Sequence, residues 1–175
     1  IFLIINYFYL YNLLYRHESR DRFKGKFPFL IMVHSDFLHL FHDKFCKVVQ
    51  DDTGCEFIGY ESNLQIPDID GKVIKIQGKS LKARKKATKI LIEEMMAEKK
   101  SKTGESTTIL VFIPEGMVSL IIGAKGRQIK VLTNESNTDI VVNQPIHKMS
   151  HRTVKIEGQP KRIARAIAMV WINFL

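Results

Sequence analysis

The 175-residue sequence contains only two cysteines, Cys46 and Cys55, which are nine residues apart and form no CxxC pair. This scarcity excludes a scaffold held by several disulfides and favours reduced thiols in an intracellular protein of the cytoplasm, the nucleus or both. The sequence also has few acidic residues: 18 Asp and Glu stand against 27 Lys and Arg, for a formal net charge of +9. This excess favours a polyanionic partner, either nucleic acid or an acidic membrane surface.

No uninterrupted apolar run reaches the roughly 20 residues that a membrane-spanning helix needs. The most apolar segment is IFLIINYFYLYNLLY at residues 1–15, which Asn6 and Asn12 interrupt. A gene-model artefact or an apolar tail docked on a partner is therefore favoured over a membrane anchor, which stays the weaker alternative. Because residues 16–26 are polar, residues 1–26 are predicted to be an apolar N-terminal tail and a polar linker.

An internal repeat follows the tail. Residues 46–57 (CKVVQDDTGCEF) align with residues 129–140 (IKVLTNESNTDI), 83 positions later, and residues 73–78 (VIKIQG) align with residues 153–158 (TVKIEG), 80 positions later. Each copy continues into a long helical pattern, and a polar stretch separates them. We therefore predict two related domains, at residues 27–100 and 109–175, joined by an exposed linker at residues 101–108.

The second copy gives the clearer pattern of elements. Its β-branched and alternating runs predict strands, and its apolar residues at helical spacing predict helices. The expected elements are a strand at 109–113, a short helix at 117–122, a helix at 127–135, strands at 139–143 and 152–157, and a helix from Pro160 onward. This order predicts an α+β fold of the form βααββα.

The segment LIIGAKGRQIKVL at residues 120–132 carries the most specific motif. It combines an apolar pair, Ile121 and Ile122, with a GxxG loop at Gly123-Ala124-Lys125-Gly126, then Ile129 and Lys130. In this element order the pattern resembles the type I K-homology (KH) RNA-binding domain. The resemblance implies that each copy is a three-stranded sheet packed by three helices, and that the second copy binds single-stranded RNA, with single-stranded DNA as a second ligand.

The residues of the loop support phosphate binding on physical grounds. Glycines permit positive φ and leave no Cβ between backbone and ligand, and amides at a helix start attract anions. Lys125, Arg127 and Lys130 add positive charge. Apolar residues beside the loop are expected to line a groove for the bases: Ile121, Ile122, Ile129, Ile140 and Val142. Lys148, His151 and Arg152 are expected either to contact base edges or to form a solvated basic rim. Asp139 occupies a position where cytosine-binding members of the family carry arginine, so a preference for cytosine is not expected by that route.

The first copy lacks this loop. Its GxxG positions fall on Leu40, Phe41, His42 and Asp43, with no glycine and with an acid where phosphate would lie. We expect a KH-like domain that kept its fold and lost its phosphate loop, with residues 36–50 forming one continuous helix. Its last helix, from about Ser80 to Lys99, is basic, and its charges are either a solvated face or an auxiliary phosphate contact. These residues are Lys79, Lys82, Arg84, Lys85, Lys86 and Lys89.

The C-terminal helix is apolar on nearly all sides from Ile163 to Leu175. Such a helix is buried on more than one side, so we expect it to pack on the first domain or on another protein.

No motif predicts an enzyme, a cofactor or a metal site. His39, His42 and Cys46 share a helical face, but structural zinc needs four ligands. The GKS at residues 78–80 lacks the earlier glycine of a phosphate loop. Two function classes therefore remain: single-stranded RNA binding through the second copy, and a structural or protein-interaction subunit of a larger ribonucleoprotein complex.

Overall fold

The two halves of the chain follow a similar order of elements, but the second half has two α-helices between its first two strands where the first half has one. The computed structural model describes residues 28–59, 69–99, 105–146 and 149–172. The first half contains β1 (Phe29–His34), the 3₁₀ helix η2 (Ser35–Leu40), α2 (Asp43–Thr53), β2 (Glu56–Gly59), β3 (Gly71–Gln77) and α3 (Leu81–Glu98). The second half contains β4 (Thr107–Pro114), η3 (Glu115–Met117), α4 (Val118–Ile122), η4 (Ala124–Gly126), α5 (Arg127–Ser136), β5 (Asp139–Val142), β6 (His151–Gly158) and α6 (Pro160–Ile172).

These elements confirm the helices and strands predicted for the second copy, with shifts of a few residues at their ends. The predicted linker at residues 101–108 is wrong at its C-terminal end, because Thr107 and Thr108 already pair with Gly158 and Glu157 in the sheet. Strand β1 has no counterpart among the elements named from the sequence. The N-terminal tail at residues 1–26 lies outside the described residues.

The six strands of the described residues form one antiparallel sheet in the order β2-β3-β1-β4-β6-β5. This differs from the two separate three-stranded sheets that were expected. The halves join where β1 pairs with β4, through Leu30 opposite Phe112 and Ile31 opposite Val111. Ile31 and Val111 are 80 positions apart, which is the offset of the sequence repeat. An approximate twofold axis therefore passes through this strand pair.

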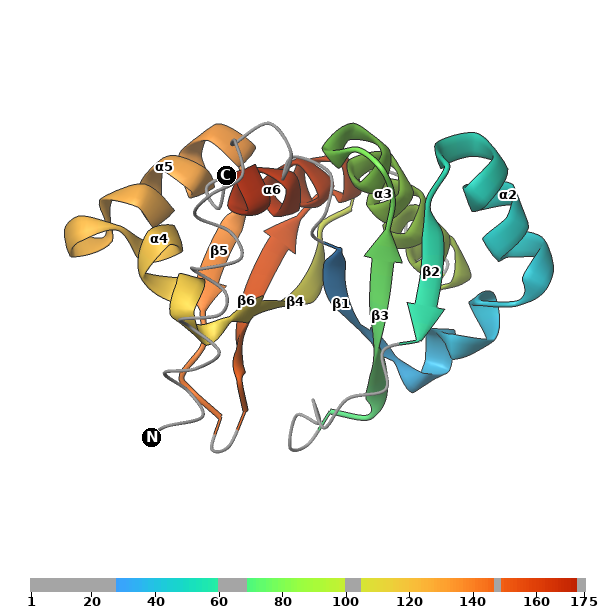
Figure 1. Ribbon diagram of the computed structural model, residues 1–175, viewed down its shortest axis with the longest axis horizontal. Coiled ribbons are helices and arrows are strands. Elements are labelled where there is room, and N and C mark those ends of the chain that lie inside the picture. Colours follow the sequence, from blue (N-terminus) through green and yellow to red (C-terminus); the bar gives the residue numbers. More distant parts are fainter. Residues whose placement is uncertain (1–27, 60–68, 100–104, 147–148, 173–175) are drawn as a thin grey trace, which may run out of the picture.

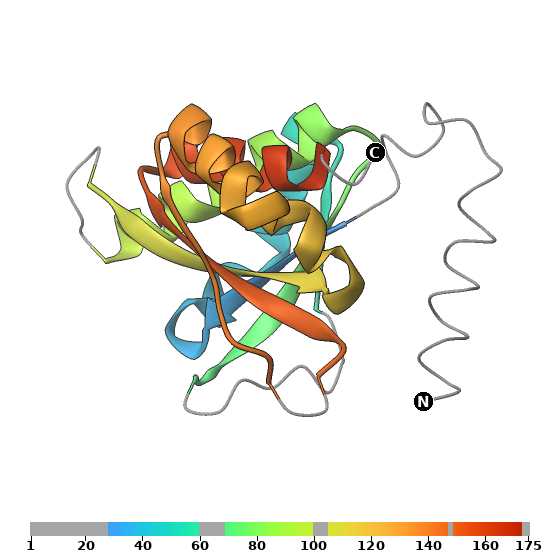
Figure 2. The same ribbon diagram turned by 90° about the vertical axis from the view of Figure 1, so that its left-hand side faces the viewer.

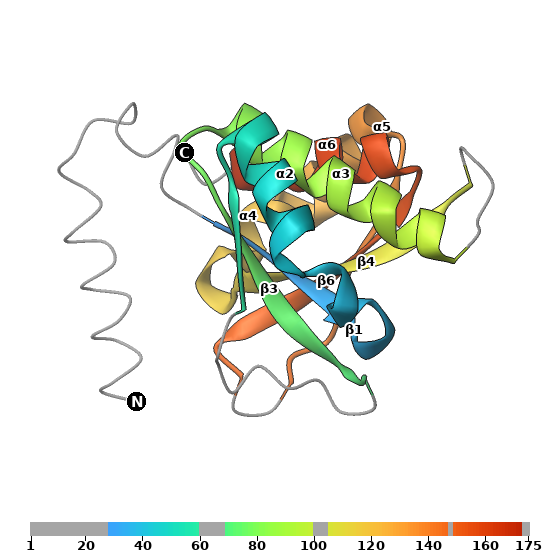
Figure 3. The same ribbon diagram turned by 90° about the vertical axis from the view of Figure 1, so that its right-hand side faces the viewer.

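The helices cover one face of the sheet (Figures 2 and 3). Helices α3 and α6 lie side by side in the middle, with α2 and α5 at opposite ends of the row (Figure 1). β1 is buried on both faces: Phe29, Ile31 and Val33 face the main core, and Leu30 and Met32 join a small cluster on the other face.

Helix α6 joins the two halves. Trp171 is only 5% exposed, and its ring stacks on Phe29 of β1 with centroids 6.0 Å apart and planes 18° apart. The guanidinium of Arg84 in α3 lies 5.3 Å from the centroid of the same Phe29 ring. The second apolar side of α6 is thus covered by the first half of the chain, which is one of the two arrangements expected from the sequence.

The single helix predicted for residues 36–50 is wrong. Phe41 and His42 separate η2 from α2, and His42 has an extended backbone (φ −78°, ψ 159°). Its Nδ1 accepts a hydrogen bond from the backbone N–H of Phe45 at 3.1 Å, so His42 caps the N-terminus of α2. The Phe41 ring packs edge-on against Phe57, which fixes the break in the core.

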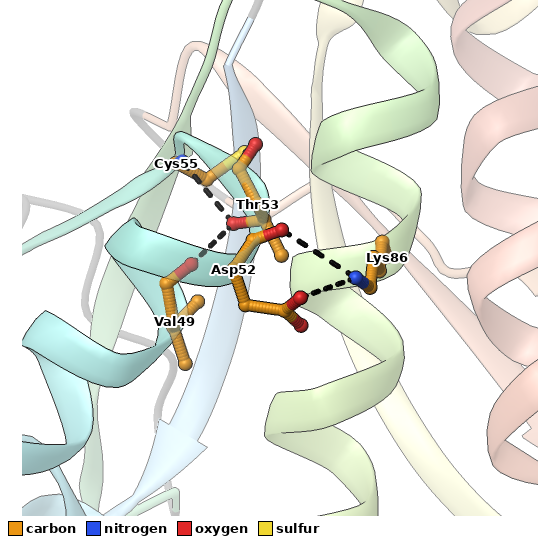
Figure 4. Close-up of polar contacts among 5 residues, drawn as sticks. All are labelled: Val49, Asp52, Thr53, Cys55 and Lys86. Carbon is orange, nitrogen blue, oxygen red and sulfur yellow. Dashed lines mark hydrogen bonds and ion pairs between the residues drawn. The ribbon is translucent and has the colours of Figure 1, made fainter.

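The C-terminal ends of α2 and α5 share a hydrogen bond from a side-chain hydroxyl to a backbone carbonyl, at positions 83 residues apart. The Thr53 hydroxyl donates to the carbonyl of Val49 at 2.6 Å and accepts the Cys55 N–H at 3.1 Å, next to a Lys86–Asp52 ion pair that ties α3 to α2 (Figure 4). In the second half, the Ser136 hydroxyl donates to the carbonyl of Leu132, also at 2.6 Å. The next residue, Gly54 or Asn137, has positive φ and ends its helix in both cases. The repeat thus extends from sequence to backbone conformation.

We expect Phe29→Ala to lower the free energy of unfolding by about 3–5 kcal/mol, because it leaves a cavity between α3, α6 and the sheet. Denaturant unfolding followed by circular dichroism and by Trp171 fluorescence measures this. Ile172→Ala is the control: that side chain is 49% exposed, and the change should cost less than about 1 kcal/mol. A Phe29→Ala cost as small as the control's would show that the stack does not hold the halves together.

Candidate nucleic-acid interface

The bend between α4 and α5 is built from left-handed backbone. Gly123 has φ 68° and ψ 175°, Lys125 has φ 53° and ψ 30°, and Gly126 has φ 74° and ψ 16°. The Gly123 N–H ends α4 by donating to the carbonyl of Ser119 at 2.8 Å. The bend therefore turns the chain sharply at one end of the molecule (Figure 1).

The two glycines are required for different reasons. A Cβ on Gly123 would lie 2.5 Å from Cβ of Gln128 and 2.9 Å from its backbone nitrogen, so the bend closes against the first turn of α5. A Cβ on Gly126 would meet nothing within 4 Å, although its φ still favours glycine. Gly123 thus shapes the bend, and Gly126 leaves the start of α5 uncovered.

The start of α5 is electropositive. Its N-cap is Gly126, and no side chain caps it. The exposed side chains around it are neutral or basic: Ala124, Lys125, Arg127 and Lys130. Within the described residues, none of these three cations forms an ion pair. The helix dipole adds to their field, so this end of α5 attracts an anion such as phosphate.

The corresponding end of α2 is closed. His42 already caps it, and Asp43 places an acid in its first turn, where α5 has Gly126 at its N-cap. The basic residues that follow are retained, because Lys44 and Lys47 match Arg127 and Lys130 at the offset of 83. The two helix starts thus differ chiefly in their capping residues.

The structure divides the predicted groove residues into two groups. Ile122, Ile129 and Val142 are half-buried and pack against the edge of the core. Ile121 has no exposed surface and Ile140 has very little, so both support the surface from below. The pocket found among the described residues, about 200 Å³ in volume, lies elsewhere, between the end of α3 and the start of β4.

Two exposed apolar residues near the bend were missed by sequence reasoning. Leu120 is 52% exposed on α4 and Val131 is 44% exposed on α5. In the run Leu120-Ile121-Ile122, the rotation of a five-residue helix decides which side chain faces outward. Tertiary packing sets that rotation, so no signal in the sequence separates the three.

The Arg152 side chain is held by other residues of the same chain. Its guanidinium donates to both carboxylate oxygens of Glu115, at 2.9 Å through Nε, and to the backbone carbonyl of Asn143 at 3.1 Å. The hydrogen bond to Glu115 raises the pKa of Arg152 above its ordinary value. This contact ties β6 to η3, just before α4, and its charge is largely compensated.

The rest of this rim adds little positive charge. Burial lowers the pKa of His151 below its ordinary value, which favours the neutral imidazole. Asp139, at the start of the edge strand β5, is exposed and lies opposite Glu157. Lys148 lies outside the described residues. The cations of this interface are therefore concentrated at the bend and the first turn of α5.

The described part of the chain contains no group of three or more His, Cys, Asp or Glu side chains placed to hold a metal ion. Among the same residues, no helix has the length and apolarity to cross a membrane.

Residues 108–171 match the family model described as the KH domain. This part of the chain is a KH domain. The match begins in β4 and ends at Trp171 in α6, so it contains the bend, α5, the edge strand β5 and its neighbour β6. KH domains are RNA-binding modules; the family is not a family of enzymes.

The chain was also compared with curated proteins and with solved structures. No curated protein matches the chain. Among solved structures, the chain is similar to one in the crystal structure of the a/eIF2alpha–aDim2p–rRNA complex from Pyrococcus horikoshii OT3. The identity is 19%, the TM-score is 0.31, and the match covers 87% of this chain and 89% of that chain.

We expect Gly123→Ala to destabilise the KH domain more than Gly126→Ala. The first change brings Cβ into contact with Gln128 and also forces a backbone conformation that almost only glycine adopts. The second adds only the cost of a left-handed alanine, about 1 kcal/mol. Thermal unfolding of both variants tests this, and equal midpoints would contradict the close packing of Gly123.

Proposed function

We propose that this chain binds single-stranded RNA through the GxxG bend and the adjacent apolar surface of its KH domain. The observation that carries the proposal is the uncapped, basic start of α5, which contrasts with the closed and acidic start of α2 in the same chain. Exposed amides, a helix dipole and three nearby cations suit a sugar-phosphate backbone. Single-stranded DNA has the same backbone charge and is a second ligand of this site.

The residues of the proposed site have distinct roles. Gly123, Ala124, Lys125 and Gly126 approach the phosphates, while Arg127 and Lys130 extend the basic surface. Ile122, Ile129 and Val142 contact the bases, with Ile121 and Ile140 supporting them from the core. Arg152 contributes by holding β6 against η3.

We further propose that the first half, residues 27–100, is a second KH-like domain that kept its fold and lost its phosphate loop. The recurring element order, the approximate twofold relation at Ile31 and Val111, and the matching helix ends at Gly54 and Asn137 support this. The KH domain at the other end of the chain then binds RNA, and the first half stabilises it through α3 and β1.

The second candidate is a structural subunit of a larger ribonucleoprotein complex, in which the first half docks on a protein. Val48 on α2 and Ile58 on β2 favour it, because they are exposed apolar residues at the end of the molecule that lacks a phosphate site. This role is compatible with RNA binding at the other end.

We expect the double variant Ala124→Asp/Lys125→Asp to bind an oligonucleotide of about five nucleotides at least tenfold more weakly than wild type. Two carboxylates at the bend repel phosphate and remove one cation. Fluorescence anisotropy with labelled RNA measures the affinity.

The matched control is Lys47→Asp/Val48→Asp, which makes the same change of charge at two exposed neighbours on α2. It should leave the binding of this short RNA unchanged. If the bend variant binds as wild type does, or if both variants lose affinity equally, the bend is not the site. Circular dichroism confirms that both variants are folded.

A further inference from the structure

The outer face of the helical layer carries basic residues that the bend does not use. In α3, Lys82 is exposed and Lys85 is partly exposed, and in α6 Arg162 and Arg165 are exposed. Within the described residues, none of the four forms an ion pair or a side-chain hydrogen bond. Their neighbours differ: Lys86 pairs with Asp52 (Figure 4) and Lys89 pairs with Glu93. The four side chains are therefore positive charges available to a ligand.

These four residues are equivalent in the repeat. Lys82 and Lys85 match Arg162 and Arg165 at the offset of 80, so each half places one basic pair at the same position of its last helix. Because α3 and α6 lie side by side on the same face of the sheet, the approximate twofold axis puts both pairs on that face (Figures 1 and 3).

The helices themselves gain nothing from these charges. Cations near a helix N-terminus oppose the helix dipole, and both pairs lie within the first two turns. Described α6 contains no acidic residue, and the acids of α3 begin only at Glu93. Neither helix thus compensates its pair with an adjacent carboxylate, so the four charges are available to an external anion.

We infer that Lys82, Lys85, Arg162 and Arg165 form a second RNA-contact surface, called here the basic quartet, which binds the backbone of the RNA beyond the nucleotides held at the bend. The inference rests on the proposed RNA binding. The ligand chemistry is a run of phosphates without base recognition, because flexible, exposed Lys and Arg side chains bind phosphate independently of sequence. The first half then contributes to affinity although it lacks a GxxG bend.

This surface predicts that RNA length matters. An oligonucleotide of about five nucleotides occupies the bend alone, whereas one of about 20 nucleotides also reaches the quartet. The longer RNA should bind at least tenfold more tightly and with a steeper salt dependence. Each phosphate contact on a single strand adds about 0.7 to the slope of log K against log salt.

The test replaces the basic residues by uncharged glutamine and measures the binding of each variant to both RNAs by fluorescence anisotropy at several salt concentrations. Lys82→Gln/Lys85→Gln, Arg162→Gln/Arg165→Gln and the combined quadruple variant should each weaken the binding of the long RNA. The quadruple variant should remove most of the length advantage and reduce the salt slope by about 2 to 3. All should bind the short RNA as wild type does.

Lys75→Gln/Lys155→Gln removes the same two charges and is the control for the double variants; Lys155 differs from the quartet in pairing with Glu157 at 3.5 Å. These two lysines are also equivalent at the offset of 80. They lie on the opposite face of the sheet, since their strand neighbours Ile74, Ile76, Val154 and Ile156 face the helical core. If this control weakens long RNA as much as a quartet double variant does, the effect is one of total charge and the inference is overturned.

The remaining outcomes separate the two proposals. Wild-type affinity of the quadruple variant for long RNA overturns the basic quartet, while the bend stands if Ala124→Asp/Lys125→Asp still loses binding. Loss of long-RNA binding in the quadruple variant but not in the bend variant overturns the bend and supports the quartet. Absence of binding to either RNA by the folded wild-type chain overturns both.

Discussion

The N-cap residue of α5 is a glycine, so no side chain caps the start of this helix, and the proposed function depends on its uncapped amides. A helix start has amides without intrahelical acceptors, and most helices satisfy them with a Ser, Thr, Asp or Asn side chain. α2 is also capped by a side chain, that of His42 at its N-cap, although histidine is an uncommon cap. In α5 the residue is Gly126, with open space where its Cβ would be. The closed start of α2 and the uncapped start of α5 thus differ in a few residues around the N-cap.

The rest of the structure keeps this helix start in place. The close approach of Gly123 to Gln128 fixes the angle between α4 and α5, and the Arg152–Glu115 contact ties the chain before α4 to β6. Behind them, the core extends through α6 to the first half, where Trp171 stacks on Phe29. The uncapped helix therefore projects from a rigid layer. Preorganisation of this kind reduces the entropy lost when a flexible RNA binds.

The sequence predicted the second half closely because its signals are local. The glycines, the apolar runs and Pro160 each mark an element boundary, and the elements lie where those signals place them. Residues that the offset of 83 aligns also share details of the structure that were not predicted, such as the positive φ at Gly54 and Asn137. What the sequence did not predict is non-local. The pairing of β1 with β4 depends on two strand edges meeting, and the exposure of Leu120 rather than Ile121 depends on how a short helix is rotated.

The helix break at His42 and the ion pair of Arg152 with Glu115 were also not predicted from the sequence. A histidine is an uncommon cap, so its role at the start of α2 was visible only in the geometry of the Phe45 amide. Arg152 was expected at base edges because it is basic and lies beside the loop that precedes β6. Its guanidinium instead meets Glu115, which is 37 positions away in the sequence. Charge patterns thus locate a basic surface, whereas the structure decides which cations are available.

The most direct test of the central claim is an NMR titration of ¹⁵N-labelled protein with a single-stranded RNA of about five nucleotides. The account predicts that the largest amide shifts fall on Gly123 to Gln128, with smaller shifts at Ile129 and Val142 and none at the start of α2. Shifts that leave the bend unchanged and cluster on the first half would contradict it.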